Sequence, residues 1–156
     1  MDWPVFIVFL AASGAAAATG AMFSPGEWYK RLVKPTWTPP DWLFPVAWTL
    51  LYLSSAYAAS RVAGLEGSAL AMAFWAMQIG FNTLWSPVFF GLHRIGAAMV
   101  ALIGLWIAVV GTFWTFIQLD VIAGLLIAPY VVWGTYAGAL NLAILRMNRS
   151  GVPAGI

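Results

Sequence analysis

The sequence contains no cysteine, a single histidine and few charged residues. Of its 156 residues, 8% are charged and 63% are hydrophobic, whereas soluble domains average about 25% charged and about 45–50% apolar residues. The lack of cysteine excludes disulfides, thiolate metal sites and cysteine nucleophiles. A scattered formal charge of +2 gives no indication of nucleic-acid binding. A chain this short cannot bury so much apolar surface in water, so we expect its solvent to be lipid.

Long hydrophobic segments occupy most of the chain. Each has about the length of the roughly 20 helical residues that cross the hydrocarbon core of a bilayer, and charged residues fall at the segment ends or between segments. Only helices and closed barrels satisfy their backbone in lipid, and the segments lack the alternation of barrel strands. We therefore predict an all-α fold, a single domain over residues 1–156 that is an integral membrane bundle of five transmembrane helices. The helices are expected at about residues 3–23, 42–61, 67–92, 95–119 and 121–146.

The connection between the first two predicted helices, residues 24–41, is longer than the others. It contains four prolines, two tryptophans and a tyrosine. Long ordered loops are often lids, and prolines lower the entropy cost of ordering one, so we predict a lid loop over one end of the bundle. A surface loop with its rings among the lipid headgroups is the alternative. Thr38, followed by Pro39 and Pro40, is also typical of a capped helix start.

Basic residues are divided unequally between the two sides of the predicted bundle. On one side, near the connections that follow the second and fourth predicted helices, the only basic residue is Arg61. The opposite side carries Lys30, Arg31, Lys34, Arg94, Arg146 and Arg149. The positive-inside rule therefore places the lid loop and the C-terminus in the cytoplasm and the N-terminus outside. The first segment lacks the basic start of a signal peptide, so we expect it to remain as a helix.

No charged side chain lies in the interior of a predicted helix. Proton relays and ion-coupled carriers usually keep ionisable groups there, so the sequence argues against a pump or an ion-coupled transporter. His93, beside Arg94, falls at the end of the third helix. We interpret it as a polar residue at the membrane surface, with ligation of a haem iron as the alternative. We predict no catalytic residue and no metal site.

Three predicted helices carry polar and aromatic side chains three or four residues apart, so each set lies on one helix face. The sets are Trp48, Tyr52 and Ser55 in the second helix, Trp75, Gln78, Asn82, Trp85 and Phe89 in the third, and Tyr130, Trp133, Ala137 and Asn141 in the fifth. Amides in lipid should face the bundle interior. Either they only bond helix to helix, or they line a pocket whose aromatic walls suit a large, flat, mostly apolar ligand. Spacing leaves both interpretations open.

Small residues form a further pattern. Residues 14–18 (GAAAA) permit close backbone approach in the first helix. The third helix has a face of small residues made of Ala69, Ala73, Ala76 and Gly80. Such faces often mediate helix association in membranes, so we predict a homodimer through the third helix.

Longer motifs connect these features to a known family. Residues 34–42 read KPTWTPPDW and residues 45–52 read PVAWTLLY. Gln78 is followed by NTLWSPVFFG at 82–91, and the fifth helix carries Pro129, Tyr130, Trp133, Leu140 and Asn141. These segments closely resemble the translocator protein / tryptophan-rich sensory protein (TspO/MBR) family, formerly the peripheral benzodiazepine receptor family. The resemblance covers nearly the whole chain, with all five helices in order.

The resemblance implies a five-helix membrane protein, commonly a homodimer, with a pocket between the helices beneath the first loop. It implies porphyrins such as protoporphyrin IX and haem as ligands, isoquinoline- and benzodiazepine-type drugs as further ligands, and no obligatory cofactor. The family motifs carry ligand-binding roles onto Trp37, Trp48, Asn82, Trp85, Trp133, Ala137, Leu140 and Asn141. The helix faces described above add Tyr52 and Phe89.

Two positions depart from the animal members of the family. Leu142 stands where those members carry the tyrosine of a cholesterol motif, and residues 95–98 (IGAA) lack their tryptophan. The sterol pattern is weak even when complete, so we expect no specific sterol recognition, and support for drug binding is reduced. Both departures fit a bacterial protein. We expect it in the cell membrane, where helical proteins usually remain, with the outer membrane, reported for some family members, as the alternative.

Porphyrin binding for transport, sensing or sequestration is the leading functional hypothesis. Trp48 and Trp133 would contact the ring, Asn82 and Asn141 would orient it, and the lid loop would close over it. The first alternative is an enzyme that degrades porphyrin under light, since indoles can donate electrons to an excited porphyrin; we favour binding without catalysis. The second is a regulatory scaffold whose ligand changes its contacts with partners.

Overall fold

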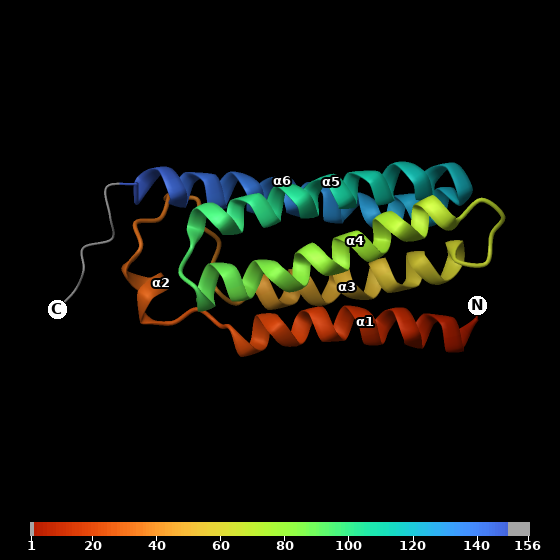
Figure 1. Ribbon diagram of the computed structural model, residues 1–156, viewed down its shortest axis with the longest axis horizontal. Coiled ribbons are helices and arrows are strands. Elements are labelled where there is room, and N and C mark those ends of the chain that lie inside the picture. The colour runs from red at the N-terminus through yellow and green to blue at the C-terminus, as the bar shows by residue number, and fades with distance from the viewer. Residues whose placement is uncertain (1, 150–156) are drawn as a thin grey trace.

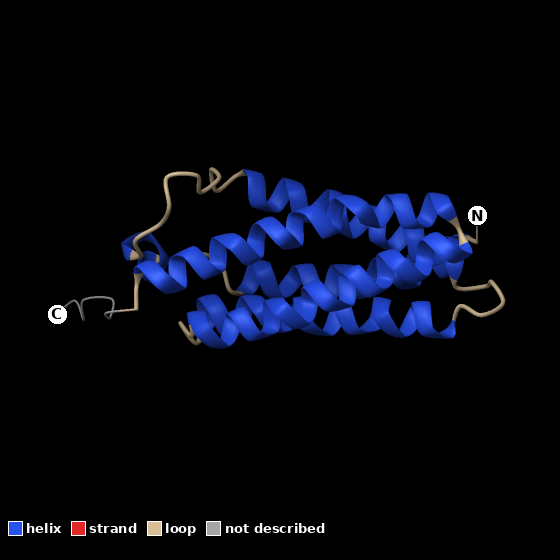
Figure 2. Ribbon diagram, turned by 90° about the horizontal axis from the view of Figure 1, so that it is seen from above, coloured by secondary structure: helices blue, strands red, loops and turns tan. Residues whose placement is uncertain are grey.

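The computed structural model describes residues 2–149, and every regular element in this range is helical (Figure 2). The all-α prediction is confirmed for this part of the chain. The elements are α1 (Trp3–Met22), α2 (Glu27–Arg31), α3 (Leu43–Val62), α4 (Ala69–Ser86), the π-helix η1 (Pro87–Gly91), α5 (Ile95–Leu119) and α6 (Val121–Met147).

Among the described residues, α1, α5 and α6 are each long and apolar enough to cross a membrane. The helices α3 and α4 are less apolar because they carry polar side chains such as Ser55, Gln78 and Asn82. All three of these side chains are buried within the bundle. Membrane helices accommodate polar groups in this way, so the chain has the character of a membrane protein whose uncharged polar groups are gathered inside.

The long helices run side by side and form a ring (Figure 1). Around this ring, α1 packs against α3, α3 against α6, α6 against α5, α5 against α4, and α4 against α1. The short helix α2 and the connection around it lie where α6 ends, which we call the lid end (Figures 1 and 2). The N-terminus lies at the opposite end, the far end (Figure 1).

Aspartates begin two of the long helices. The Asp2 carboxylate accepts from the Val5 backbone N–H (3.3 Å), and Asp120 accepts from the backbone N–H of Ala123 (3.0 Å), so each is an N-cap. Asp120 also pairs with the Arg61 guanidinium of α3 (2.7 Å) at the far end. The Ala123 hydrogen bond and the Arg61 charge together hold the pKa of Asp120 below its ordinary value.

The connection between α1 and α3 differs from its prediction. Thr38 does not cap a helix: its hydroxyl donates to the Pro35 carbonyl (2.7 Å). The following helix, α3, begins several residues later and has no side-chain cap. The connection also contains the short helix α2, which was not predicted because five residues are too few for a periodic pattern.

The third long helix is divided into two parts. The segment expected as one helix over residues 67–92 is α4 followed directly by η1. Pro87 has no N–H to donate to the preceding turn, and the chain widens there: the Leu92 N–H donates to the Pro87 carbonyl five residues earlier (2.9 Å). Such π-turns inside helices often accompany functional sites.

The hydrophobic core is dense at the far end and thinner at the lid end. The far-end core is built from α3, α4, α5 and α6, with buried residues that include Ala58, Ala59, Val62, Ala71, Val109, Phe116, Ala123 and Ile127. A second cluster joins α2 and the loop to the ends of the long helices, through Tyr29, Leu32, Phe89, Ala98, Leu140 and Ile144. Tyr29, Phe89, Leu140 and Ile144 of this second cluster border open space inside the bundle.

Candidate functional site

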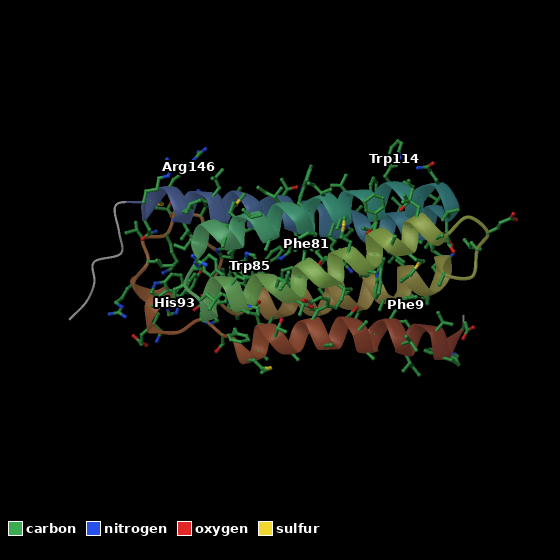
Figure 3. The ribbon with its side chains drawn as sticks, viewed as in Figure 1. Phe9, Phe81, Trp85, His93, Trp114 and Arg146 are labelled. Atoms are coloured by element: carbon green, nitrogen blue, oxygen red, sulfur yellow. The ribbon has the colours of Figure 1, made fainter. Side chains whose placement is uncertain are left out.

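A cavity of about 630 Å³ lies in the lid half of the bundle, between α1, α3, α4, η1 and α6. This volume is within the range of about 300–1,000 Å³ that is typical of small-molecule sites. Trp85, one of its wall residues, lies between the helices toward the lid end, whereas Trp114 points away from the bundle near the far end (Figure 3). The aromatic lining residues are Tyr29, Phe44, Trp48, Tyr52, Trp85, Phe89 and Phe90.

Asn82 connects three helices at the cavity wall. The Tyr52 hydroxyl of α3 donates to Asn82 Oδ1 (2.9 Å), and Asn82 Nδ2 donates to the Tyr130 hydroxyl of α6. All three side chains are buried. The Asn82 amide therefore bonds helix to helix and lines the cavity at the same time. Both interpretations of the polar helix faces, interhelical bonding and pocket lining, apply to this residue.

Asn141 has the same double role on α6. Its Oδ1 accepts from the Trp85 indole N–H (3.3 Å), and its Nδ2 donates to the Ile95 carbonyl at the start of α5 (3.2 Å). These bonds fix the Trp85 indole with one face along the cavity wall. Both cavity amides thus have their hydrogen-bonding capacity largely used within the protein, and the surface they leave is mainly aromatic.

Two pairs of stacked rings line the cavity. Trp48 stacks on Tyr52 along α3, with ring centroids 5.5 Å apart and planes at 28°. Trp85 stacks on Phe89 where α4 passes into η1, at 5.0 Å and 24°. Offset ring stacking favours flat aromatic partners, so the two pairs present surfaces suited to a planar conjugated ligand.

Two buried polar groups have no partner among the described residues. The Gln78 side chain, one turn before Asn82 on α4, makes no hydrogen bond although it is 1% exposed, and neither does the buried Ser13 hydroxyl of α1. Trp75, on the same face, donates its indole N–H to Ser55 Oγ (3.0 Å). On this face of α4, Trp75 and Asn82 therefore have hydrogen-bond partners, whereas the Gln78 side chain between them has none among the described residues.

The helix α2 covers the lid end of the cavity. Tyr29 contacts Phe89 and Phe90 edge to face, with centroids 6.2 Å and 5.4 Å away. The Lys34 ammonium donates to the Tyr29 carbonyl (2.6 Å) and to the Leu32 carbonyl (3.1 Å), which closes the end of α2. Burial raises the pKa of the Tyr29 phenol, so this ring stays neutral well into alkaline pH.

Hydrogen bonds attach the connection to α6. The Asn148 side chain pairs with the backbone of Val33 in both directions: Val33 N–H donates to Asn148 Oδ1 (3.1 Å), and Asn148 Nδ2 donates to the Val33 carbonyl (2.9 Å). The Tyr136 hydroxyl donates to the Trp37 carbonyl (2.7 Å). The connection is therefore an ordered cover held on the α6 side.

The structure brings most of the predicted site residues to one cavity. The residues that line it are Trp48, Tyr52, Asn82, Trp85, Phe89, Ala137, Leu140 and Asn141. Trp133 does not line it; its ring meets Phe44 edge to face (5.9 Å) and borders a separate void of about 20 Å³. Trp37 is 47% exposed and lies edge to face on Tyr136 outside the cavity. His93 lies at the lid end, stacked on Trp28 with centroids 4.3 Å apart (Figure 3).

One wall of the cavity was not predicted from the sequence. This wall belongs to α1 and consists of Ala16, Ala17, Gly20 and Ala21. The small residues of this helix predict close packing, yet toward the lid end they border open space. Phe44 and Asp41 were also missed. Asp41 is the one charged residue among those that line the cavity, and its position directly before a helix of aromatic residues was the available signal.

Comparison with known proteins agrees with this architecture. The profile of the TspO/MBR family matches residues 5–147. A tryptophan-rich sensory protein from Cereibacter sphaeroides is 53% identical over 148 residues, which cover 95% of this chain and 94% of the relative. Protein CrtK from Rhodobacter capsulatus is 49% identical over 157 residues, 98% of each chain. The human translocator protein is 29% identical over 154 residues, 94% of this chain and 91% of its own. The chain is a membrane protein of the TspO/MBR family.

Proposed function

We propose that this protein binds a flat, mostly apolar tetrapyrrole, such as protoporphyrin IX or haem, in the aromatic cavity, and that binding serves transport, sensing or sequestration. The observation that carries the proposal is a cavity lined by two stacked ring pairs, Trp48–Tyr52 and Trp85–Phe89. Planar conjugated rings gain most from such walls. The names of the relatives, sensory protein and translocator protein, support sensing and translocation as the uses of the bound ligand.

Isoquinoline- and benzodiazepine-type drugs are proposed as a second ligand class for the same cavity. The start of α5, where the tryptophan of animal members is missing, contributes no lining residue. A drug in this cavity therefore gains no direct contact from residues 95–98. These residues touch the site through Asn141, whose Nδ2 donates to the Ile95 carbonyl (3.2 Å).

In the proposed membrane arrangement, α1, α3, α4 with η1, α5 and α6 all span the bilayer. The lid end, with the basic residues of α2, faces the cytoplasm, and the N-terminus lies outside. The homodimer is proposed to form through α4, whose small residues Ala69, Ala73, Ala76 and Gly80 are exposed. A Cβ placed on Gly80 would meet nothing within 4 Å, so a second helix can approach closely there.

Tryptophan fluorescence tests the ligand site. Protoporphyrin IX titrated into the purified protein in lipid should quench fluorescence with saturation. Trp48→Leu removes one ring of a stacked pair and should weaken binding about tenfold, because aromatic pairs contribute about 0.5–1.5 kcal/mol beyond their buried area. Trp114→Leu, on the outer surface, should bind like the parent protein, and Trp133→Leu, whose ring packs on the cavity residue Phe44, should weaken binding less than Trp48→Leu. Equal affinity of all three variants, or no saturable binding, would contradict the proposal.

Crosslinking in bilayers tests the dimer. Ala76→Leu places a bulky side chain on the small-residue face of α4 and should reduce the crosslinked dimer strongly. Ala97→Leu makes the same change at an exposed position on α5 and should leave it unchanged. A dimer insensitive to Ala76→Leu would move the interface to another face of the bundle.

A further inference from the structure

The cavity is closed on most sides by direct contacts. Between α1 and α4, a Cβ placed on Gly20 would lie 3.7 Å from Ser86 Oγ, and the Phe23 ring lies directly over Gly91 of η1. Between α4 and α6, the hydrogen bond from Trp85 to Asn141 closes the wall. These contacts join α1 to α4 and η1, and α4 to α6, beside the cavity.

The α3–α6 side is closed by aromatic rings. Phe44 meets Trp133 edge to face at 5.9 Å, and Trp48 meets Tyr130 in the same way at 5.7 Å. Tyr130 is 1% exposed and is held by Asn82. Opening this side would separate two ring pairs and break a buried hydrogen bond.

The loop and α2 close the lid end, and their attachments lie away from α3. Val33 is bonded to Asn148 and Trp37 to Tyr136, both beside or on α6. Tyr29 rests on the rings of η1. Among the described residues, the side-chain hydrogen bonds that fasten this cover to a long helix therefore reach α6 and not α1.

The seam between α1 and α3 is different. Among the residues that line the cavity, the exposed ones all lie in the lid-end parts of α1 and α3 or in the loop segments next to them; the loop residues are Ser24, Pro25 and Asp41. The exposed lining residues within the two helices are Gly20 and Ala21 of α1 and Pro45 and Thr49 of α3. We call them the portal. Thr49 lies six residues into α3, about 9 Å from its start at a rise of about 1.5 Å per residue, so the portal reaches into the membrane-embedded part of the bundle. At the far end the same two helices are joined by Phe6 and Tyr57, whose rings are 6.4 Å apart.

We infer that the ligand enters and leaves sideways through the portal, directly from the bilayer, while the lid stays closed. This inference rests on the proposed tetrapyrrole binding and adds its route. A flat macrocycle partitions into the membrane with its plane along the lipid chains, and a slot bordered by small side chains admits it edge first. Asp41, which lines the cavity at its lid end, disfavours a porphyrin carboxylate beside it.

Exchange kinetics in lipid vesicles test the route. Ala21→Phe and Thr49→Phe should each slow association and dissociation of protoporphyrin IX by about tenfold or more, with the Kd changed by less than about threefold, because an obstructed passage raises the barrier in both directions. Ala18→Phe and Leu50→Phe carry the same bulk on exposed neighbours that do not line the cavity and should exchange like the parent. Asn148→Ala, which loosens the lid, should also leave both rates unchanged.

The outcomes separate the route from the function. If the parent protein shows no saturable binding, the proposed function is wrong. If it binds and the portal variants exchange at the parental rate, or Asn148→Ala accelerates exchange, the ligand passes under the lid and the portal inference is overturned. Diluting the vesicles at a constant ratio of porphyrin to lipid should leave the association rate unchanged; a fall in proportion to volume indicates access from water and also overturns it.

A second form of the experiment avoids bulky substitutions during folding. Because the chain has no cysteine, Ala21→Cys offers a single thiol that a bulky maleimide can modify after the protein has folded. Modification should slow exchange as Ala21→Phe does, and modification of Ala18→Cys should not. Unchanged exchange after complete labelling at residue 21 would overturn the inference independently.

Discussion

The lid half and the far half of the bundle are built from the same long helices but differ in what faces the middle. In the far half, Ala58, Ala59, Ala71 and Ala123 are fully or almost fully buried and bring the backbones together around Val109 and Phe116. In the lid half, the small residues of α1 and Ala137 of α6 line the cavity together with the paired rings of α3 and of α4 with η1. Small residues shared by facing helices close a bundle, whereas small residues opposite fixed rings leave a cavity.

The two halves also differ in how their ends are fixed. At the far end, the Arg61–Asp120 pair joins α3 to the start of α6 next to a turn of one residue. At the lid end, a long connection is held by side chains bonded to backbone carbonyls and amides. The far end is thus held by an ion pair and tight packing, whereas the lid end is held by the hydrogen bonds of the connection that covers the cavity.

The sharpest contrast should come from the same substitution in each half. A Cβ on Gly124 would lie 2.6 Å from the Ile117 backbone Cα, which cannot move away easily, so Gly124→Ala should destabilise the protein by about 1–3 kcal/mol. Gly20→Ala meets only Ser86 Oγ, at 3.7 Å, and gains helix propensity of up to about 1 kcal/mol. Thermal unfolding midpoints in detergent measure both; similar losses would show that the lid half is packed as densely as the far half.

Adjacent turns of α4 provide the next test. Asn82→Leu leaves the Tyr52 and Tyr130 hydroxyls without their partner and should cost about 1–2 kcal/mol. Gln78→Leu removes a buried amide that has no partner among the described residues, so it should leave stability unchanged or raise it by about 1 kcal/mol. Chemical denaturation in mixed micelles compares them. A large loss for Gln78→Leu would indicate that this amide is bonded through water in the native protein.

Removing the charge of Asp41 at the cavity tests ligand affinity rather than protein stability. Asp41→Asn should tighten binding of a dicarboxylate porphyrin about threefold at low salt, because removing a like charge at a partly screened site is worth up to about 1 kcal/mol. Glu66→Gln, in the turn at the far end, should have no effect. Binding titrations at low and high salt test whether the change in affinity is electrostatic, because salt screening should remove the difference between the parent and Asp41→Asn. An effect that persists in high salt would point to a change in shape instead.

The smallest effect is expected at the far end as a function of pH. The folded protein lowers the pKa of Asp120, so its charge stabilises the fold above the ordinary carboxyl pKa, and this contribution is lost as pH falls through the lower folded-state value. Asparagine keeps the N-cap, so Asp120→Asn should lower stability at neutral pH by less than about 1 kcal/mol. The unfolding midpoints of parent and variant should converge in strong acid. If the two curves of unfolding midpoint against pH stay parallel, the lost stability of Asp120→Asn comes from a weaker helix N-cap and not from the charge.

The positions of the long helices could be predicted because lipid imposes one length and charged residues mark the ends. The segment expected over residues 95–119 corresponds to α5, with the same bounds. The helix faces with Asn82 and Asn141 could be predicted because buried amides must turn inward. Helical spacing thus carried information about which side chains meet in the middle.

Other features of the site depend on tertiary contacts that spacing does not contain. The helical spacing predicts that Trp133 and Trp48 both point inward, but the Trp133 ring packs edge to face on Phe44, and of these two rings only Phe44 lines the cavity. The Trp37 motif suggests a ligand contact, whereas its backbone carbonyl is bonded to Tyr136 and its ring remains outside. The α1 wall consists of side chains too small to give any pattern. Which ring reaches the cavity is decided by neighbours on other helices.

The π-helix η1 makes the outline of the cavity sensitive to chain length. The hydrogen-bonded turn there contains one residue more than an α-helical turn, so deleting Val88 would restore ordinary helical winding and rotate the next part of the chain by about 100°. Such a deletion would redirect the rings of Phe89 and Phe90 without replacing any side chain. The number of residues in η1 therefore controls the shape of the binding space independently of which side chains it carries.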